Sequence, residues 1–192
     1  MTTVFKKFAT GIAVVALLTT GVASGAMASP VTKDITTNIT GTTNPVFSEI
    51  SATSFTTPFA LNGKDQVMTG AAINGFTVTD ARGTGAGWNV TVKASQFEDK
   101  VLGRTLTTDA LSLSAPTVTK AVGALGSSDP RTITTAGGNI GVTDIRVLSA
   151  AKDGGMGTFD VSAMDLSVNV LPKDVLAGDY TSTVTVSIVA GP

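Results

Sequence analysis

Two of the residue types that most often carry chemistry in proteins are missing from this chain of 192 residues. The sequence contains no histidine and no cysteine. Without histidine the chain lacks the usual general base near neutral pH and the usual ligand of zinc and copper. Without cysteine it has no thiol nucleophile, no disulfide and no site for a bacterial lipid anchor. These absences argue against an enzyme, and we expect no cofactor.

The reactive groups that remain are mainly carboxylates. They stand singly or in pairs in segments expected to be loops, among them Glu98, Asp99, Asp144 and Asp153. Calcium binding needs roughly six to eight oxygen ligands, usually from closely spaced positions, and no segment has that spacing. A metal site is therefore not expected. Two carboxylates brought into one cleft, as in glycoside hydrolases, remain the open route to an enzyme.

The most distinctive segment has glycines at alternating positions directly before the only tryptophan, Trp88. A phosphate-binding glycine loop must be followed by a helix, whereas a strand pattern follows here. Trp88 has two interpretations: a core residue at the start of a strand, or an exposed platform that stacks on a sugar of a wall polymer. The candidate binding residues are Arg82, Gly83, Gly85, Gly87, Trp88 and Asn89.

The segments around these residues show the period of strands with one buried face. Phe76 and Val78 share one side of the first segment, and Trp88, Val90 and Val92 share one side of the second. The glycine-rich residues between them are typical of a turn. We therefore predict a hairpin over residues 76–92.

The same alternation extends along the rest of the chain. At the C-terminal end, Val184, Val186 and Ile188 alternate with threonine and serine. A short helix could lie near residues 95–102. Further strands are predicted over residues 35–39, 111–113, 118–122, 131–134, 144–148, 157–161 and 166–170. The fold is predicted to be all-β, an antiparallel β-sandwich with long Gly-rich loops and, as one option, an immunoglobulin-like strand order.

The N-terminus predicts export. Lys6 and Lys7 precede an apolar stretch, and Ala26-Met27-Ala28 provides a small-x-small cleavage site. The strongly apolar part is shorter than the roughly 20 residues that span a bilayer. We therefore predict a signal peptide over residues 1–28, one secreted domain over residues 29–192, and no membrane association after cleavage.

The charge balance argues against binding to a polyanion. The chain has 13 basic and 14 acidic side chains. Removing residues 1–28 takes away Lys6 and Lys7 and no acid, which leaves 11 against 14, a net charge of −3. A nucleic-acid-binding domain would carry a basic patch. We expect no nucleic-acid partner.

Two segments resemble the WxL-domain surface proteins of Gram-positive bacteria. One covers residues 79–92 and contains the Gly-Trp strand, and the other covers residues 171–188 and contains Ala-Gly-x-Tyr-Thr-Ser-Thr. Order and spacing agree over most of the mature chain. The first Trp-x-Leu stands here as Trp88-Asn89-Val90, and the second as Val186-Ser187-Ile188 without tryptophan.

The resemblance implies a β-sandwich attached non-covalently to peptidoglycan or another wall polymer, often beside a partner surface protein. We therefore expect a secreted, non-catalytic cell-surface protein that binds the wall or another surface protein through the end bearing Gly83 to Trp88. The alternative is a structural subunit of a surface fibre. In that alternative the Thr-rich residues 31–44 would pair with an open sheet edge of a neighbouring molecule.

Overall fold

The computed structural model describes residues 36–55 and 59–191. The predicted signal peptide lies outside these ranges. Of residues 1–37 only Thr36 and Thr37 are described, and neither belongs to a helix or strand. The strands found in the described residues all lie in the unit formed by residues 38–192. Within the described ranges no helix has the length and hydropathy needed to cross a membrane.

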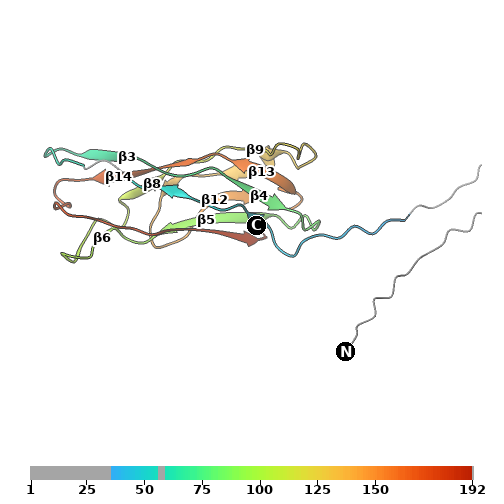
Figure 1. Ribbon diagram of the computed structural model, residues 1–192, viewed down its shortest axis with the longest axis horizontal. Coiled ribbons are helices and arrows are strands. Elements are labelled where there is room, and N and C mark those ends of the chain that lie inside the picture. The colour runs from blue at the N-terminus through green and yellow to red at the C-terminus, as the bar shows by residue number, and fades with distance from the viewer. Residues whose placement is uncertain (1–35, 56–58, 192) are drawn as a thin grey trace, which may run out of the picture. The chain divides into compact units, whose positions relative to one another are not determined.

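Two layers of antiparallel strands form a β-sandwich (Figure 1), so the predicted fold class is confirmed. The first layer contains β1 (Val46–Phe47), β2 (Ala52–Thr53), β3 (Gln66–Ile73), β4 (Phe76–Asp80), β8 (Leu111–Leu113), β9 (Val118–Lys120), β11 (Gly138–Asn139), β13 (Gly157–Val161) and β14 (Met164–Val170). The second layer has the order β10 (Ile133–Thr135), β12 (Ile145–Ala150), β5 (Trp88–Ala94) and β15 (Val184–Ala190). A small hairpin pairs β6 (Glu98–Asp99) with β7 (Arg104–Thr105), and a 3-10 turn, η1, covers Pro130–Thr132.

The strands of the first layer continue through a break in the middle. Ile73 of β3 pairs with Met164 of β14, and three residues further along Phe76 of β4 pairs with Val161 of β13. Three residues forward from β3 to β4 correspond to three residues back from β14 to β13, so the pairing register is the same on both sides of the break. β3 and β4 are therefore two segments of one strand, and β13 and β14 are two segments of its partner.

At the break, backbone hydrogen bonds also join each central strand to the strand on its outer side. The backbone N–H of Asn74 donates to the carbonyl of Ser51 at 2.9 Å, and that of Ser162 donates to Thr117 at 2.9 Å. The central pair is thus flanked on one side by β1 and β2, and on the other side by β8 and β9. The first layer is therefore one long sheet whose pairing continues across the break.

The core lies between the two layers and contains the predicted apolar faces. In β4 both apolar residues are buried, and the threonines that alternate with them are half-buried. In β5 the side chains of Trp88, Val90 and Val92 are all fully buried. Phe159 of β13 meets Trp88 from the opposite layer, with ring centroids 6.5 Å apart. The period-two interpretation of both segments is confirmed.

The predicted C-terminal strand is confirmed as β15. Val184, Val186 and Ile188 are half-buried against the core, and Thr185 is exposed. β15 pairs with β5 and stands last in its layer, so it is an edge strand. Thr181 precedes the strand and forms an isolated bridge with Glu98.

Most of the other predicted strands occur close to their expected positions. Those over residues 111–113 and 157–161 match β8 and β13 at both ends. The strand predicted over residues 131–134 is only partly confirmed, because residues 131 and 132 belong to the 3-10 turn η1 and strand β10 begins at Ile133. No strand occurs over residues 36–39, the described part of the strand predicted over residues 35–39.

The hairpin predicted over residues 76–92 is wrong. β4 pairs with β1 and β13 in the first layer, whereas β5 pairs with β12 and β15 in the second. Both edges of each strand are already occupied by other partners, so the two strands cannot pair with each other. The glycine-rich residues 81–87 instead cross from one layer to the other.

The helix considered near residues 95–102 is also wrong, because β6 and its turn occupy this segment. Asp99 Oδ1 accepts hydrogen bonds from the backbone N–H groups of Val101 at 2.9 Å and Leu102 at 3.1 Å. Such a side-chain acceptor stabilises a turn in competition with a helix. An isolated helix of this length is also unfavourable, because its costly first turn is followed by few further hydrogen bonds.

Candidate functional site

The predicted binding segment lies at the end of the sandwich where β4 ends and β5 begins. Gly83 is exposed at the tip of this crossing, together with its neighbour Thr84. The other predicted binding residues are buried: Arg82, Gly85, Gly87, Trp88 and Asn89. A contact between the exposed tip and a wall polymer stays a prediction.

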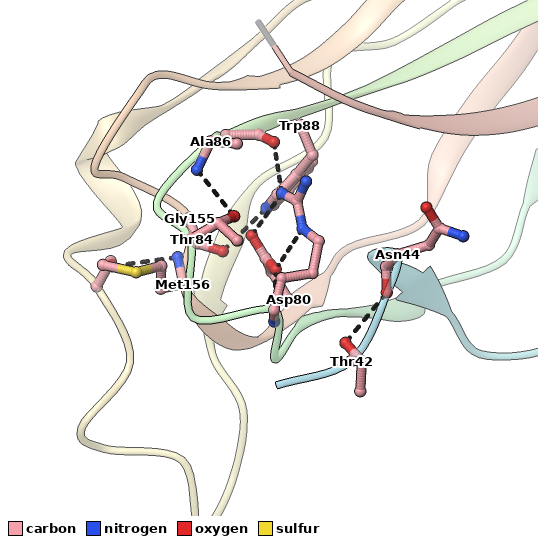
Figure 2. A network of polar contacts seen from close by, with 11 residues as sticks. Thr42, Asn44, Asp80, Thr84, Ala86, Trp88, Gly155 and Met156 are labelled. Atoms are coloured by element: carbon pink, nitrogen blue, oxygen red, sulfur yellow. Dashed lines mark hydrogen bonds and ion pairs between the residues drawn. The ribbon is translucent and has the colours of Figure 1, made fainter. Parts of the chain in front are cut away.

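Trp88 is a core residue, and its interpretation as an exposed stacking platform is wrong. Its exposed fraction is 0%, and its indole N–H donates to the carbonyl of Gly155 at 2.9 Å (Figure 2). Gly155 has a φ of 69°, and a Cβ there would lie 2.7 Å from the indole nitrogen. Glycine therefore allows the backbone to approach the ring this closely. A sugar has no access to an aromatic face that the core covers.

A buried ion pair fixes the crossing that leads to Trp88 (Figure 2). Arg82 Nε donates to Asp80 Oδ1 at 2.8 Å, and Arg82 Nη2 donates to Asp80 Oδ2 at 2.8 Å. The same Nη2 donates to the carbonyl of Gly87 at 2.6 Å. This two-pronged geometry is the strongest that a guanidinium and a carboxylate form. Arg82 therefore holds the two ends of the crossing together, and its charge is not presented at the surface.

The ion pair changes the acid titration of Asp80. Burial by itself would raise the pKa of Asp80, but the hydrogen bonds and positive charge of Arg82 outweigh burial and hold the pKa below its ordinary value of 3.8. A carboxyl whose pKa is lower in the folded state stabilises the fold above the unfolded-state pKa. That contribution disappears as the pH falls through the lowered folded-state pKa.

We expect Asp80→Asn to lower the free energy of unfolding most near neutral pH. Its difference from the native chain should shrink as the pH falls from 3.8, the ordinary pKa of the carboxyl, to the lowered folded-state pKa, because Asp80 of the unfolded native chain is protonated in this range while Asp80 of the folded chain is not. Urea titrations at a series of acidic pH values measure this difference. A difference that stays constant until the fold is lost in acid would contradict the lowered pKa.

Asn89 closes the same end of the sandwich. Its side-chain amide donates to the carbonyl of Gly191 at 2.7 Å, beside the pairing of Trp88 with Ala190. Its Oδ1 is buried and has no hydrogen-bond partner among the described residues. The amide therefore ties the end of β15 to β5, and the side chain does not face solvent.

A pocket of about 600 Å³ lies at the opposite end of the sandwich, where β14 and β5 end and β15 begins. Asp179 is the one charged residue among the described residues that line it. The other lining side chains are mostly aromatic or aliphatic, and include Phe55, Phe59, Met68, Phe97, Val170 and Tyr180. The volume falls within the range of roughly 300–1,000 Å³ that is typical of ligand sites.

The segment Ala-Gly-x-Tyr-Thr, which carries part of the family resemblance, builds one wall of this pocket. The hydroxyl of Tyr180 donates to the carbonyl of Leu176 at 2.9 Å and closes a short loop. Thr181 exchanges two backbone hydrogen bonds with Glu98, at 3.0 and 2.9 Å. Gly178 lies against the carboxylate of Asp99, where a Cβ would displace it. These contacts fix the loop to the β6–β7 hairpin.

Large apolar side chains are also exposed at this end. Leu61 and Leu176 line the pocket, and both are exposed to solvent. Val101 and Leu102 form the tip of the β6–β7 hairpin, which packs against the pocket wall through Asp99. Val101 is 90% exposed. An apolar pocket with apolar residues around it is typical of a surface that binds another molecule.

Sequence reasoning missed this pocket because its residues lie far apart in the chain. Its floor comes from β14, one wall from residues 175–180, and the rest from residues near Phe59 and Phe97. The sequence signal that could have pointed to it is the Ala-Gly-x-Tyr segment. Among the described residues the pocket lining contains one carboxylate, that of Asp179, and no group of three His, Cys, Asp or Glu side chains that could hold a metal ion is found among them.

Comparison with known proteins identifies the family. No curated protein and no solved structure matches the chain. The family model described as "WxL domain surface cell wall-binding" matches residues 29–192. Its match begins at the first residue after the predicted cleavage site. Because the match covers most of the chain and agrees with the resemblance of residues 79–92 and 171–188, this protein belongs to the WxL domain family of surface domains that bind the cell wall.

Proposed function

We propose that this chain is a secreted, non-catalytic cell-surface protein that is held at the wall without a covalent bond. It binds peptidoglycan or a partner surface protein. The family match supports association with the wall. The observation that carries the proposal further is the apolar pocket at the end of the sandwich bearing Tyr180.

The composition of the pocket supports contact through apolar groups. Aromatic side chains such as Phe59, Phe97 and Tyr180 can cover the apolar face of a sugar, the methyl groups of a wall peptide, or an apolar side chain of a partner protein. Asp179 at the pocket wall adds a single acceptor for a hydrogen bond from the bound molecule. The pocket thus offers a large contact area with little charge to desolvate.

The exposed tip of the glycine-rich crossing is a second place where the wall could make contact. Gly83 and Thr84 are accessible there, while Ala86 is half-buried and Gly85 and residues 87–90 are buried. The pocket presents far more apolar surface than this tip. We therefore place the main contact at the pocket end and treat the tip as the competing location.

A sedimentation assay with purified cell walls tests the proposal. We expect Leu176→Asp to weaken binding about tenfold or more, because central interface contacts are worth about 1.4 kcal/mol or more each. Leu176 is exposed, so the fold should tolerate the change. Leu125→Asp is the matched control, because Leu125 is exposed in a loop away from the pocket and should bind like the native chain.

The same assay separates the competing locations. Loss of binding in Thr84→Asp with full binding in Leu176→Asp would move the contact to the glycine-rich tip. If the native chain stays in the supernatant with walls and with extracts of surface proteins alike, the proposed function is wrong.

A structural subunit of a surface fibre, assembled by strand exchange, is the second candidate function. The open edge of β15 supports it, because an added strand needs a free edge. Thr42, at the C-terminal part of the proposed donor segment, donates its backbone N–H to Ala81 of its own chain at 3.0 Å. An exchanged strand would therefore end before Thr42. Electron microscopy of the concentrated chain decides between this candidate and the wall-bound domain.

A further inference from the structure

β15 is the longest open strand edge in the described part of the chain. It stands last in the second layer and pairs with β5 over seven consecutive residues without a bulge. The other edges of the two layers are formed by strands of two or three residues: β1, β2, β9, β10 and β11. Short edge strands are one way in which proteins avoid pairing with other chains, and β15 lacks this protection.

Every second residue of β15 turns its backbone hydrogen-bonding groups away from β5. The N–H of Ser95 donates to Thr183 at 2.9 Å, and the N–H of Gly191 donates to Gly87 at 3.0 Å. Hydrogen-bonded and non-hydrogen-bonded pairs alternate along an antiparallel ladder. The residues whose N–H and C=O groups point outward are therefore Val184, Val186, Ile188 and Ala190.

Side-chain features that would block pairing are also missing from this edge. β15 has the sequence Val-Thr-Val-Ser-Ile-Val-Ala, with no charged residue and no proline. Lysine, proline and bulges are the usual devices that protect an exposed edge. An edge with none of them is suited to accept another strand.

The inner face of β15 is also incompletely covered. Val90 and Val92 of the neighbouring strand β5 are fully buried. Val184, Val186 and Ile188 face the same core from β15 but are only half-buried. A further strand beside β15 would extend the layer and remove more of these three side chains from water.

We infer that a second copy of this chain pairs with β15, antiparallel and about a two-fold axis at Ser187. A two-fold axis brings one surface patch against itself, and an axis at Ser187 lets all seven residues overlap. The cross-strand pairs would be Val184 with Ala190, Thr185 with Val189, Val186 with Ile188, and Ser187 with Ser187. Aliphatic residues then meet on the inner face, no like charges oppose each other, and the outward backbone groups of both strands are satisfied.

This dimer goes beyond the proposed function and does not depend on it. It leaves the apolar pocket free, since the pocket is lined by residues before β15 and by other strands. It also differs from a fibre, because a two-fold contact closes after two molecules. The sedimentation assay with cell walls and the measurements of dimer formation can therefore give independent results, and either proposal can fail without the other.

Cysteine cross-linking tests the register, since the chain has no native cysteine. Opposed residues in a non-hydrogen-bonded pair have Cα atoms about 4.5 Å apart, which a disulfide can span. We expect Ser187→Cys to form a disulfide-linked dimer under mild oxidation. Thr185→Cys is the matched control, because two residues at this position would lie about 13 Å apart along the strands and should not cross-link.

A proline substitution provides an independent test by measurement of molecular mass in solution. Val186→Pro removes an N–H that points away from β5, so the ladder within one molecule is kept. We expect the native chain and Val186→Thr to show twice the mass of Val186→Pro across a concentration series. Circular dichroism tests whether Val186→Pro is folded. If this variant is not folded, the cross-linking result alone decides whether the dimer forms.

The inference is overturned if the native chain is monomeric throughout the series. It is also overturned if Ser187→Cys fails to cross-link, or cross-links no better than Thr185→Cys. A native chain that pairs only with a different surface protein would assign the edge to that partner instead.

Discussion

Replacing Trp88 by alanine should lower the free energy of unfolding by about 3–5 kcal/mol, the usual cost of removing a large buried aromatic side chain. The ring is fully buried between the layers and contacts Phe159. Its removal also leaves the buried carbonyl of Gly155 without its hydrogen bond. Because domains of this kind have a total stability of about 5–15 kcal/mol, the loss is a large part of it. Urea unfolding followed by circular dichroism measures it.

Trp88→Phe is the graded control for this prediction. It keeps an aromatic ring in the core but removes the N–H that donates to Gly155. We expect an intermediate loss of about 1–3 kcal/mol from the unsatisfied carbonyl, with a further loss from the smaller ring. If Trp88→Ala unfolds at the same urea concentration as the native chain, the ring does not stabilise the core.

The tryptophan of the first Trp-x-Leu is thus a structural residue in this molecule. The two triplets lie side by side in the second layer, because Val90 of β5 pairs with Ile188 of β15. Their alternate residues face the same core, which explains how Val186 can stand where the family pattern has a second tryptophan.

Strands could be predicted from the sequence where alternation is uninterrupted. β8 and β13 were located at both ends, since each has buried apolar residues on one face. β3 was missed because its ladder with β14 shifts register between Leu166 and Val168, opposite the segment that contains Gly70. Gly70 has a φ of 102°, and the irregularity interrupts the alternation on which the prediction depends.

Strand pairing could not be predicted in the same way. The local sequence of residues 76–92 resembles a hairpin, but the partners of β4 and β5 come from distant parts of the chain. The candidate site shows the same limit. The glycine-rich segment was conspicuous because it is contiguous, yet most of it is buried around the Asp80–Arg82 ion pair. The pocket has no contiguous segment, since folding alone brings Phe59, Phe97 and Tyr180 together.

Replacing Arg82 by alanine should destabilise the fold by about 3–5 kcal/mol, because it leaves the carboxylate of Asp80 buried without its cation. The exposed fractions of the two side chains are 4% for Arg82 and 1% for Asp80, so water cannot easily replace the guanidinium. The carbonyl of Gly87 loses one of its two hydrogen bonds in the same variant and keeps the one from the N–H of Gly191. Urea unfolding at neutral pH measures the change in the free energy of unfolding.

A double-mutant cycle then separates the ion pair from other effects of the substitution. Asp80→Ala combined with Arg82→Ala removes both charges, so it should cost less than the sum of the single variants, with an interaction energy of about 0.5–3 kcal/mol. Arg82→Lys keeps the charge but lacks the planar fork that holds both carboxylate oxygens and Gly87, so it should restore only part of the stability. Additive single losses would mean that the crossing is held by its glycines and backbone contacts, and that the ion pair between Asp80 and Arg82 contributes little.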